Sequence, residues 1–374
     1  MKLPRYYQLE KYVSSGKVLL LLGPRQIGKT TLANDYVKAS QLKSLVVSGD
    51  SLSVQQTFGS QELATLAAAV EGYELLVIDE AQRIANIGWS LKILVDALPH
   101  LAIIATGSSS FELVGQVGEP LTGRKTTLTL FPMAELELGM QANAHERSAS
   151  LPERLVYGGY PAVITTTTQA AKKELLRELL NSYLLKDILE LEQVKSTKLL
   201  LDLLRLLAFQ VGSEVSLSEL AGQLQINVRT VARYLDLFEK SYIIFSLRGY
   251  SRNLRKEVTK KAKYYFYDLG MRNAVIENFN DIQIRNDVGQ LWENYVFMER
   301  KKYREYKHQP ANEFFWRTWT GQEIDLIEER AGELHGYESK WSDKSAKPPT
   351  DWQKTYPTAT WKQIGPKNYH DFVG

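Results

Sequence analysis

The sequence predicts a multidomain α/β protein whose N-terminal domain contains a parallel sheet. The chain has 374 residues, 44% of them apolar, and short apolar runs alternate with helical stretches up to about residue 130. This length corresponds to about two or three domains, and the apolar content is ample for buried cores. Strands that alternate with helices form parallel sheets that helices cover on both faces.

The expected strands of the N-terminal domain are short and apolar. They are Lys17 to Leu22, Leu45 to Val47, Leu75 to Ile78, Leu101 to Ala105 and Thr126 to Leu130. We expect this domain to cover residues 1–135, because the alternation ends near Phe131-Pro132.

The first expected strand leads into a glycine-bounded loop with the pattern G-x-x-x-x-G-K-[ST], known as Walker A. Glycines let backbone N–H groups approach phosphate oxygens, which a Cβ would block. Lys29 is expected to reach the β- and γ-phosphates of ATP, and the hydroxyl of Thr30 to bind Mg²⁺. The residues expected to bind the nucleotide here are Gly23, Pro24, Arg25, Gln26, Ile27, Gly28, Lys29, Thr30 and Thr31.

An acidic pair follows the expected strand Leu75 to Ile78. Asp79, at the C-terminal end of this strand, is expected to bind Mg²⁺ directly or through water, as in Walker B. Glu80 is placed to orient and polarise the attacking water as a general base, with a solvated charge at the start of a helix as the alternative. The pair indicates hydrolysis rather than nucleotide binding alone.

Hydroxyl residues and one arginine are further candidates for the same site. Thr106 or Ser108 can sense the γ-phosphate or the attacking water, but a helix N-cap before Phe111 explains these hydroxyls equally well. Arg124 can stabilise transition-state charge as an arginine finger, within its own chain or towards a neighbouring copy. The alternative for Arg124 is an exposed cation in a turn.

The composition excludes several classes of protein. Without cysteine the chain has no disulfide and no thiolate metal site, which fits a reducing cytoplasm. Its five histidines show no zinc-ligand spacing, and a net charge of only +3 requires any nucleic-acid surface to come from local clusters. No signal peptide follows Met1, and the run Val18 to Leu22 is too short to span a bilayer. We therefore expect a soluble cytoplasmic protein.

Residues 136–195 are expected to form a helical connector. The turn cluster Tyr157-Gly158-Gly159-Tyr160-Pro161 precedes a segment, Lys172 to Glu192, that has leucines at helical spacing among charges. Such a stripe is typical of core packing, with a partner surface as the alternative.

Residues 196–250 predict a winged helix-turn-helix. Ser216 to Leu235 contains two helical patterns separated by a short turn, with Asn227 as the N-cap of the second helix, and Tyr242 to Leu247 reads as a following strand. Such modules bind DNA, and they also serve as protein-contact domains in ATPases. The residues expected to project from the recognition helix are Arg229, Thr230 and Arg233.

A dense cationic run follows. Its members are Arg248, Arg252, Arg255, Lys256, Lys260, Lys261 and Lys263. With Tyr250 among them, these cations can contact the phosphates of nucleic acid, and a solvated hairpin is the alternative. We expect Arg252, Arg255 and Lys256 to make such contacts.

The last expected domain, residues 251–374, carries a second set of charges suited to catalysis. Asp325 lies in the middle of one expected strand, and Glu338 and Lys340 share a face of the next. Glu293, on a preceding helix, can join them. Such carboxylates bind Mg²⁺ or Mn²⁺, and the lysine can activate a metal-bound water for attack on a phosphodiester. A cross-strand salt bridge is the alternative.

Nearly the whole chain resembles a family of bacterial and archaeal AAA-like ATPases, related to the STAND NTPases, whose C-terminal domain of unknown function resembles restriction endonucleases. The resemblance rests on the Gly23 to Thr30 loop, Asp79-Glu80, Thr106-Gly107-Ser108, Gly123-Arg124, Tyr157-Gly158-Gly159-Tyr160-Pro161, Tyr265-Phe266-Tyr267-Asp268-Leu269-Gly270, Glu293, Asp325 and Glu338-x-Lys340.

This resemblance implies an ASCE-type P-loop ATPase core, a winged helix and a PD-(D/E)XK nuclease-like domain. Asp268 precedes a small helix and is expected to be its N-cap rather than a site residue. The residues that match the ATPase motifs are Lys29, Thr30, Asp79 and Glu80, and those that match the nuclease motif are Glu293, Asp325, Glu338 and Lys340.

These patterns predict an ATP-binding and ATP-hydrolysing, DNA-directed protein whose nucleotide state controls a metal-dependent nuclease. The alternative is a nucleotide-dependent switch that binds DNA or a partner protein and has an inert C-terminal domain. ATP, Mg²⁺ and DNA are the expected ligands, and no membrane is involved. A homo-oligomer is required if Arg124 acts on a neighbouring copy.

Overall fold

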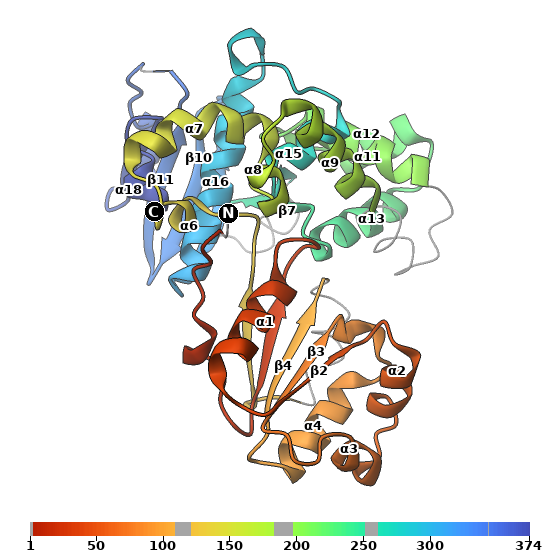
Figure 1. Ribbon diagram of the computed structural model, residues 1–374. Coiled ribbons are helices and arrows are strands. Elements are labelled where there is room, and N and C mark those ends of the chain that lie inside the picture. Colours follow the sequence, from red (N-terminus) through yellow and green to blue (C-terminus); the bar gives the residue numbers. More distant parts are fainter. Residues whose placement is uncertain (1–2, 109–120, 183–196, 251–260, 343) are drawn as a thin grey trace. The chain divides into compact units, whose positions relative to one another are not determined.

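The computed structural model describes residues 3–108, 121–182, 197–250, 261–342 and 344–374. The chain divides into two compact units (Figure 1). The N-terminal unit consists of Arg5–Phe131 and Lys240–Tyr242, and the C-terminal unit of Met1–Pro4, Pro132–Glu239 and Ile243–Gly374. Within the described ranges, no helix combines the length and the apolar character needed to cross a membrane.

The N-terminal unit is built on a five-stranded parallel sheet in the order β2-β3-β4-β1-β5. The strands are β1 (Val18–Leu22), β2 (Ser44–Ser48), β3 (Leu75–Asp79), β4 (Ala102–Gly107) and β5 (Lys125–Thr129). The predicted parallel sheet is therefore confirmed, with strand ends shifted by one or two residues from the expected ones.

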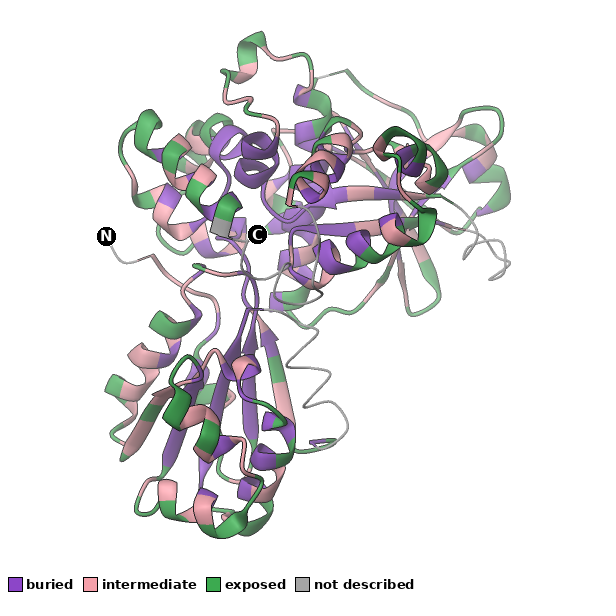
Figure 2. Ribbon diagram, turned by 90° about the vertical axis from the view of Figure 1, so that its right-hand side faces the viewer, coloured by how far each residue is buried: buried purple, intermediate pink, exposed green. Residues whose placement is uncertain are grey.

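Helices cover both faces of this sheet (Figure 1). Leu20 and Leu22 of β1 pack in one core with Leu66 of α3 and Leu91 of α4, while α1 lies on the other side. Because all five residues of β1 are buried, the strand reads as a continuous apolar run (Figure 2). The helical elements of this unit are η1 (Leu9–Lys11), α1 (Lys29–Ser40), α2 (Leu52–Phe58), α3 (Leu63–Ala69), η2 (Ala81–Arg83) and α4 (Ile87–Ala97).

The C-terminal unit contains a seven-stranded mixed sheet in the order β12-β11-β10-β9-β7-β8-β6. β7 pairs with β9 in parallel, with Arg248 opposite Phe314, so one sheet runs across the expected domain boundary at residue 250. The strands are β6 (Glu214–Val215), β7 (Ile244–Gly249), β8 (Ala262–Phe266), β9 (Asn312–Arg317), β10 (Glu323–Arg330), β11 (Glu333–Ser339) and β12 (Thr360–Ile364).

The 19-residue helix α16 contacts α6, α7, α15 and α18 and the strands β8 and β11, and α15 also contacts α7, α9 and α11. The helix expected from Lys172 is observed as α9, and its expected continuation beyond Ser182 lies outside the described residues. The helical elements are α6 (Glu135–Leu138), α7 (Ala144–Tyr157), α8 (Pro161–Thr165), α9 (Gln169–Ser182), α11 (Thr197–Phe209), α12 (Leu217–Leu224), α13 (Val228–Lys240), α15 (Leu269–Val275), η4 (Ile282–Ile284), α16 (Val288–Tyr306), α17 (Thr350–Thr355) and α18 (His370–Val373).

Candidate functional site

The loop between β1 and α1 requires its two glycines. Gly23 has φ 138°, and a Cβ there would lie 2.0 Å from the carbonyl oxygen of Leu130 on the neighbouring chain segment. Gly28 has φ 94° and precedes the first residue of α1, with open space where a Cβ would be. Such a loop leaves backbone N–H groups at a helix N-terminus accessible to an anion. The cradle therefore fits a phosphate group.

The side chain of Lys29 lies inside this loop. It is only 5% exposed, and its Nζ donates hydrogen bonds to the carbonyl oxygens of Gly23 (2.8 Å) and Pro24 (2.6 Å). The buried ammonium is thus held by two carbonyls of the same loop whose N–H groups are suited to phosphates. A positive charge in this position suits an anionic ligand such as a polyphosphate.

Thr30 and Asp79 meet at the carboxyl edge of the sheet. The Thr30 hydroxyl donates to both carboxylate oxygens of Asp79, at 2.9 and 3.0 Å, and the hydroxyl of Thr106 donates to Oδ1 of the same carboxylate. Hydroxyl and carboxylate oxygens are the ligands that Mg²⁺ prefers. The three residues come from α1, β3 and β4, so the parallel sheet brings them together.

Glu80 follows Asp79 in a left-handed conformation, with φ 50° and ψ 44°. Gly49 approaches it closely: a Cβ on Gly49 would lie 2.4 Å from the carbonyl oxygen of Glu80. The N–H of Gly49 also donates to the carbonyl oxygen of Asp79 at 2.8 Å. A non-glycine residue in this region of φ and ψ costs about 1–3 kcal/mol, and such strain is concentrated at functional sites.

Gln82, which no sequence motif indicated, joins Glu80 to Ser108. Its Nε2 donates to Glu80 Oε2 at 2.6 Å and to Ser108 Oγ at 3.1 Å. The side chain is buried, and its Oε1 has no hydrogen-bond partner among the residues that the structure describes. An amide two positions after the acid pair was the available signal, but only the fold shows that the 3-10 helix η2, which contains Gln82, turns this side chain back towards Glu80.

Arg124 lies at the other end of the strands. Its carbonyl accepts a hydrogen bond from the N–H of Val18, the first residue of β1, at 3.0 Å, whereas Gly23 follows the last residue of that strand. Five residues of strand span roughly 16 Å. The guanidinium of Arg124 forms an ion pair with Asp96 of α4. The fold therefore does not bring Arg124 to the phosphate loop of its own chain.

Two helices and a strand, α12, α13 and β7, lie where the helix-turn-helix and its following strand were expected, and β7 belongs to the seven-stranded sheet. Ser216 accepts a hydrogen bond from Glu219 N at 3.4 Å at the start of α12, and Asn227 Oδ1 accepts one from Arg229 N at 2.8 Å at the start of α13. On α13, Arg229 and Arg233 are exposed and Thr230 is half-buried. Three other expected nucleic-acid contacts lie outside the described residues: Arg252, Arg255 and Lys256.

The expected acidic set assembles at one edge of the seven-stranded sheet. Asp325, near the start of β10, accepts hydrogen bonds from Ser339 N (2.9 Å) and Ser339 Oγ (3.2 Å) on β11. Lys340 Nζ lies 2.6 Å from Glu338 Oε1. Glu293 reaches this edge from α16 and accepts a hydrogen bond from the hydroxyl of Tyr265 at 2.6 Å.

Burial dominates the electrostatics of this acidic set. Burial, followed by the negative charge of Asp325, raises the pKa of Glu293 to about 8. Burial also raises the pKa of Asp325, and burial with the charge of Asp325 raises the pKa of Glu338. Among the described residues, no group of three or more acidic or histidine side chains has the arrangement that a metal ion needs. The expected set of Glu293, Asp325 and Glu338 is thus gathered but not arranged as a three-carboxylate metal centre.

Lys263 was expected on a solvated or nucleic-acid-binding hairpin, and that expectation is wrong. Its side chain is 2% exposed, because it lies on β8 within the sheet and points to the acidic edge. Burial alone would lower the pKa of Lys263, but the charges of Glu293 and Glu323 outweigh it and raise the pKa.

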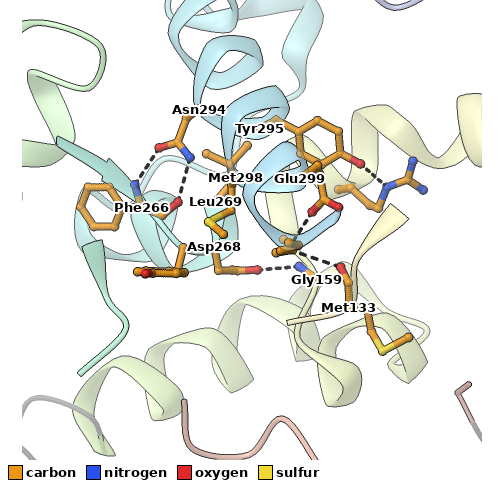
Figure 3. A pocket seen from close by; sticks show the side chains of 13 residues that line it. Met133, Gly159, Phe266, Asp268, Leu269, Asn294, Tyr295, Met298 and Glu299 are labelled. Carbon is orange, nitrogen blue, oxygen red and sulfur yellow. Dashed lines mark hydrogen bonds and ion pairs between the residues drawn. The ribbon is translucent and has the colours of Figure 1, made fainter. Parts of the chain in front are cut away.

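Asp268 is a helix N-cap, as predicted. Its Oδ1 accepts a hydrogen bond from Met271 N at 3.0 Å at the start of α15, and its Oδ2 accepts one from Gly159 N at 2.6 Å (Figure 3). Gly158 has φ 73°, and a Cβ there would lie 2.1 Å from Asp268 Oδ1. Gly158 and Gly159 therefore let the backbone lie directly against the carboxylate of Asp268. Burial raises the pKa of Asp268, against the N–H donors that lower it.

Three family matches cover most of the chain. Residues 15–138 match the family described as an AAA domain. Residues 148–282 match the domain of unknown function DUF8612, and residues 288–359 match the domain of unknown function DUF4143. The AAA match spans the loop, Asp79 and Glu80, and with their geometry it supports an AAA-like P-loop ATPase.

Three relatives from bacteria and an archaeon are described as uncharacterized proteins. One from Mycobacterium tuberculosis is 27% identical over 339 residues, which cover 89% of this chain and 72% of that protein. Another, from Haemophilus influenzae, is 25% identical over 292 residues, with 72% of each chain covered. An uncharacterized protein of Methanocaldococcus jannaschii is 25% identical over 257 residues, with 64% of this chain and 56% of that protein covered.

Two solved structures resemble this chain at low TM-scores. The replication initiator DnaA bound to AMPPCP and single-stranded DNA aligns with 62% of this chain and 84% of its own, at 15% identity and a TM-score of 0.30. The RuvB Holliday junction branch migration motor of Thermotoga maritima aligns with 64% of this chain and 83% of its own, at 18% identity and a TM-score of 0.28. Scores this far below 0.5 do not establish a shared overall fold.

Proposed function

We propose that this chain is an ATP-hydrolysing switch that acts on DNA. The observation that carries the hydrolytic part is the contact of the Thr30 hydroxyl with both oxygens of Asp79, directly beside Glu80. A pair of oxygen ligands for Mg²⁺ next to a candidate general base is the arrangement that ATP hydrolysis needs.

Each residue of the site has a distinct role in this proposal. When bound, Mg²⁺–ATP supplies an activated phosphoryl group whose charge the metal neutralises. The loop N–H groups and Lys29 would hold the phosphates, and Thr30 and Asp79 would hold the metal. The carboxylate of Glu80 would accept the proton of the attacking water, while Gln82 keeps that carboxylate in place.

Paired substitutions test the ATPase. Lys29→Ala should abolish binding of a fluorescent ATP analogue in the presence of Mg²⁺, because the loop loses its buried cation. Glu80→Gln should retain binding but lower phosphate release by about 10²–10⁴-fold, the usual contribution of a general base. Lys38→Ala, which removes an exposed lysine from the same helix α1, is the matched control. Equal phosphate release by Glu80→Gln and Lys38→Ala would refute the role of Glu80.

The DNA-directed part rests on α13. Arg229 and Arg233 are exposed on the second helix of a helix-turn-helix arrangement, and exposed cations on such a helix are suited to phosphate and base contacts. Hydrolysis in the N-terminal unit would then change how the C-terminal unit engages DNA.

A nucleotide-controlled, metal-dependent nuclease is the second candidate. The observation in its favour is that Asp325, Glu338 and Lys340 meet at one sheet edge. Plasmid and single-stranded DNA incubated with Mg²⁺ or Mn²⁺, with and without ATP, test it. Cleavage that Lys340→Ala abolishes while ATP hydrolysis continues would establish the nuclease. Intact DNA under all these conditions would leave the switch as the function.

A further inference from the structure

One edge of the seven-stranded sheet collects four carboxylates and a buried ammonium group. β10 contributes Glu323 and Asp325, β11 ends beside Glu338, and α16 contributes Glu293. Lys263 lies on the neighbouring part of the same sheet, near the start of β8. The strand pairings bring Glu323 and Lys263 to the same end of the sheet. Glu323 pairs with Arg317, the last residue of β9, and β9 runs parallel to β7. The end of β7 lies opposite the start of β8, where Lys263 is located.

Lys263 lies among these acids. Its Nζ donates to Glu323 Oε1 and lies 3.8 Å from Glu293 Oε1. The ring centroid of Phe315 is 5.1 Å from the same nitrogen. The ammonium is thus enclosed by two carboxylates and an aromatic face, with 2% of the side chain exposed. Burial of a charge is costly unless partners such as these compensate the lost hydration, so Lys263 belongs to the buried interior of this unit.

The remaining carboxylates also have partners from the protein. Asp325 accepts two hydrogen bonds from Ser339, and Glu338 is 2.6 Å from Lys340. Glu293 accepts the hydrogen bond of Tyr265. Each acid of the set is therefore paired with a donor or a cation of the chain itself.

A divalent cation needs a different arrangement. Mg²⁺ requires oxygen ligands at about 2.0–2.1 Å in near-octahedral geometry, and Ca²⁺ takes six to eight at about 2.3–2.6 Å. No three acidic or histidine side chains in the described part of the chain converge in this way. Lys263 and Lys340 together carry the two positive charges that one divalent ion would supply. With the ammonium of Lys263 between Glu323 and Glu293, the residues at this edge do not fit a metal ion.

We infer that the ammonium of Lys263 is the resident cation of this acidic set, so that the C-terminal unit binds no divalent metal there and works as a non-cleaving fold. The inference concerns a site that ATP hydrolysis does not use, so either can fail without the other. It decides between the two functions above, because a metal-dependent nuclease requires the metal.

Binding of Mn²⁺, measured by electron paramagnetic resonance without nucleotide, tests the inference on the full chain. All variants are made in a protein that carries Asp79→Asn, here called the background protein. This change removes the proposed metal ligand of the N-terminal site, so that Mn²⁺ bound there does not contribute to the signal. The background protein should bind no Mn²⁺ at this sheet edge, and its melting temperature should not change with Mn²⁺. Binding of one Mn²⁺ that a further Asp325→Asn change removes would overturn the inference.

Lys263→Met in the same background is the second measurement. Removal of one partner from a buried ion pair costs several kcal/mol, so the melting temperature should fall by roughly 10 °C. Mn²⁺ should then bind and restore much of the loss, because Glu293, Glu323 and Asp325 would lack their cation. Lys263→Arg, which keeps the charge, should behave like the background. A folded Lys263→Met protein that neither binds Mn²⁺ nor gains stability from it would also overturn the inference. If Lys263→Met fails to fold, the inference is tested by Mn²⁺ binding to the background protein with and without Asp325→Asn.

Discussion

Gln82 holds Glu80 through a hydrogen bond of 2.6 Å from its side-chain amide to the carboxylate. The same amide nitrogen reaches Ser108 at 3.1 Å, so one buried side chain links the residue after β4 to the proposed base. Gln82 is therefore a positioning residue: it contacts the proposed base Glu80 and acts on the substrate only through Glu80.

Gln82→Leu should lower kcat for ATP hydrolysis by up to about 10²-fold, the usual cost of a misplaced catalytic group. KM for ATP should change little, because Lys29 and the loop remain. Steady-state kinetics with Mg²⁺–ATP measure both values. Gln223→Leu, which alters an exposed glutamine on α12, is the control. A rise in KM with kcat unchanged would assign Gln82 to substrate binding instead.

Arg124→Ala should leave the ATP turnover of dilute protein unchanged, because Arg124 lies at the opposite end of β1 from Gly23 and pairs with Asp96. Loss of an arginine finger lowers turnover by about 10³–10⁵-fold. Phosphate release measured over a range of protein concentrations distinguishes an Arg124 without a catalytic role from an Arg124 that acts as an arginine finger. A loss that appears only at concentrations where the native activity rises would instead assign Arg124 to a neighbouring copy.

Gly158→Ala should destabilise the C-terminal unit by about 1–3 kcal/mol or more, because φ is 73° and the new Cβ would lie 2.1 Å from Asp268 Oδ1. Urea denaturation measures the change. Gly222→Ala is the matched control: it lies inside α12, has no atom within 4 Å of the new Cβ, and should raise stability by about 0.5–1 kcal/mol. Equal effects of the two substitutions would contradict this account of the turn.

The ion pairs of Asp287 predict a loss of stability in acid. Burial alone would raise the pKa of Asp287, but hydrogen bonds from Arg285 and the charge of Arg272 outweigh it and hold the pKa at about 2, below its usual 3.8. Because the folded pKa is depressed, the contribution is complete above pH 3.8 and is lost as the pH falls towards 2. Asp287→Asn should be less stable than the native protein at pH 6, and the difference should shrink in this window. A stability difference between the two proteins that stays constant from pH 6 to pH 2 would contradict this role of the Asp287 ion pairs.

Arg229→Ala and Arg233→Ala should each weaken DNA binding and reduce the slope of log K against log salt by about 0.9 if each arginine contacts one phosphate. Fluorescence anisotropy at several salt concentrations gives the slope. Lys354→Ala, which removes an exposed cation from α17, should leave the slope unchanged. A slope that is insensitive to all three changes would exclude α13 as the DNA-contacting helix.

Local sequence patterns were sufficient to predict the loop between β1 and α1 and the buried strand that ends in Asp79. The run Val18 to Leu22, the two glycines of the loop and the acids Asp79 and Glu80 carry the strand, the turn and the chemistry within short segments. Backbone conformation and the apolar pattern of a strand are properties of short segments, so the five parallel strands could be predicted. The N-cap role of Asp268 followed in the same way.

Contacts between segments far apart in the chain decided what local sequence patterns could not predict. Whether Arg124 reaches the loop depends on which end of β5 lies beside the end of β1, and Gln82 reaches Glu80 only because η2 turns it back. Lys263 reads as one more cation in a basic run, yet the pairing of β8 with β7 places it among carboxylates that lie far away in the chain. The sequence by itself determined which groups are present and how each segment folds. The tertiary structure decided which charges meet, because burial and ion pairing depend on contacts between distant segments.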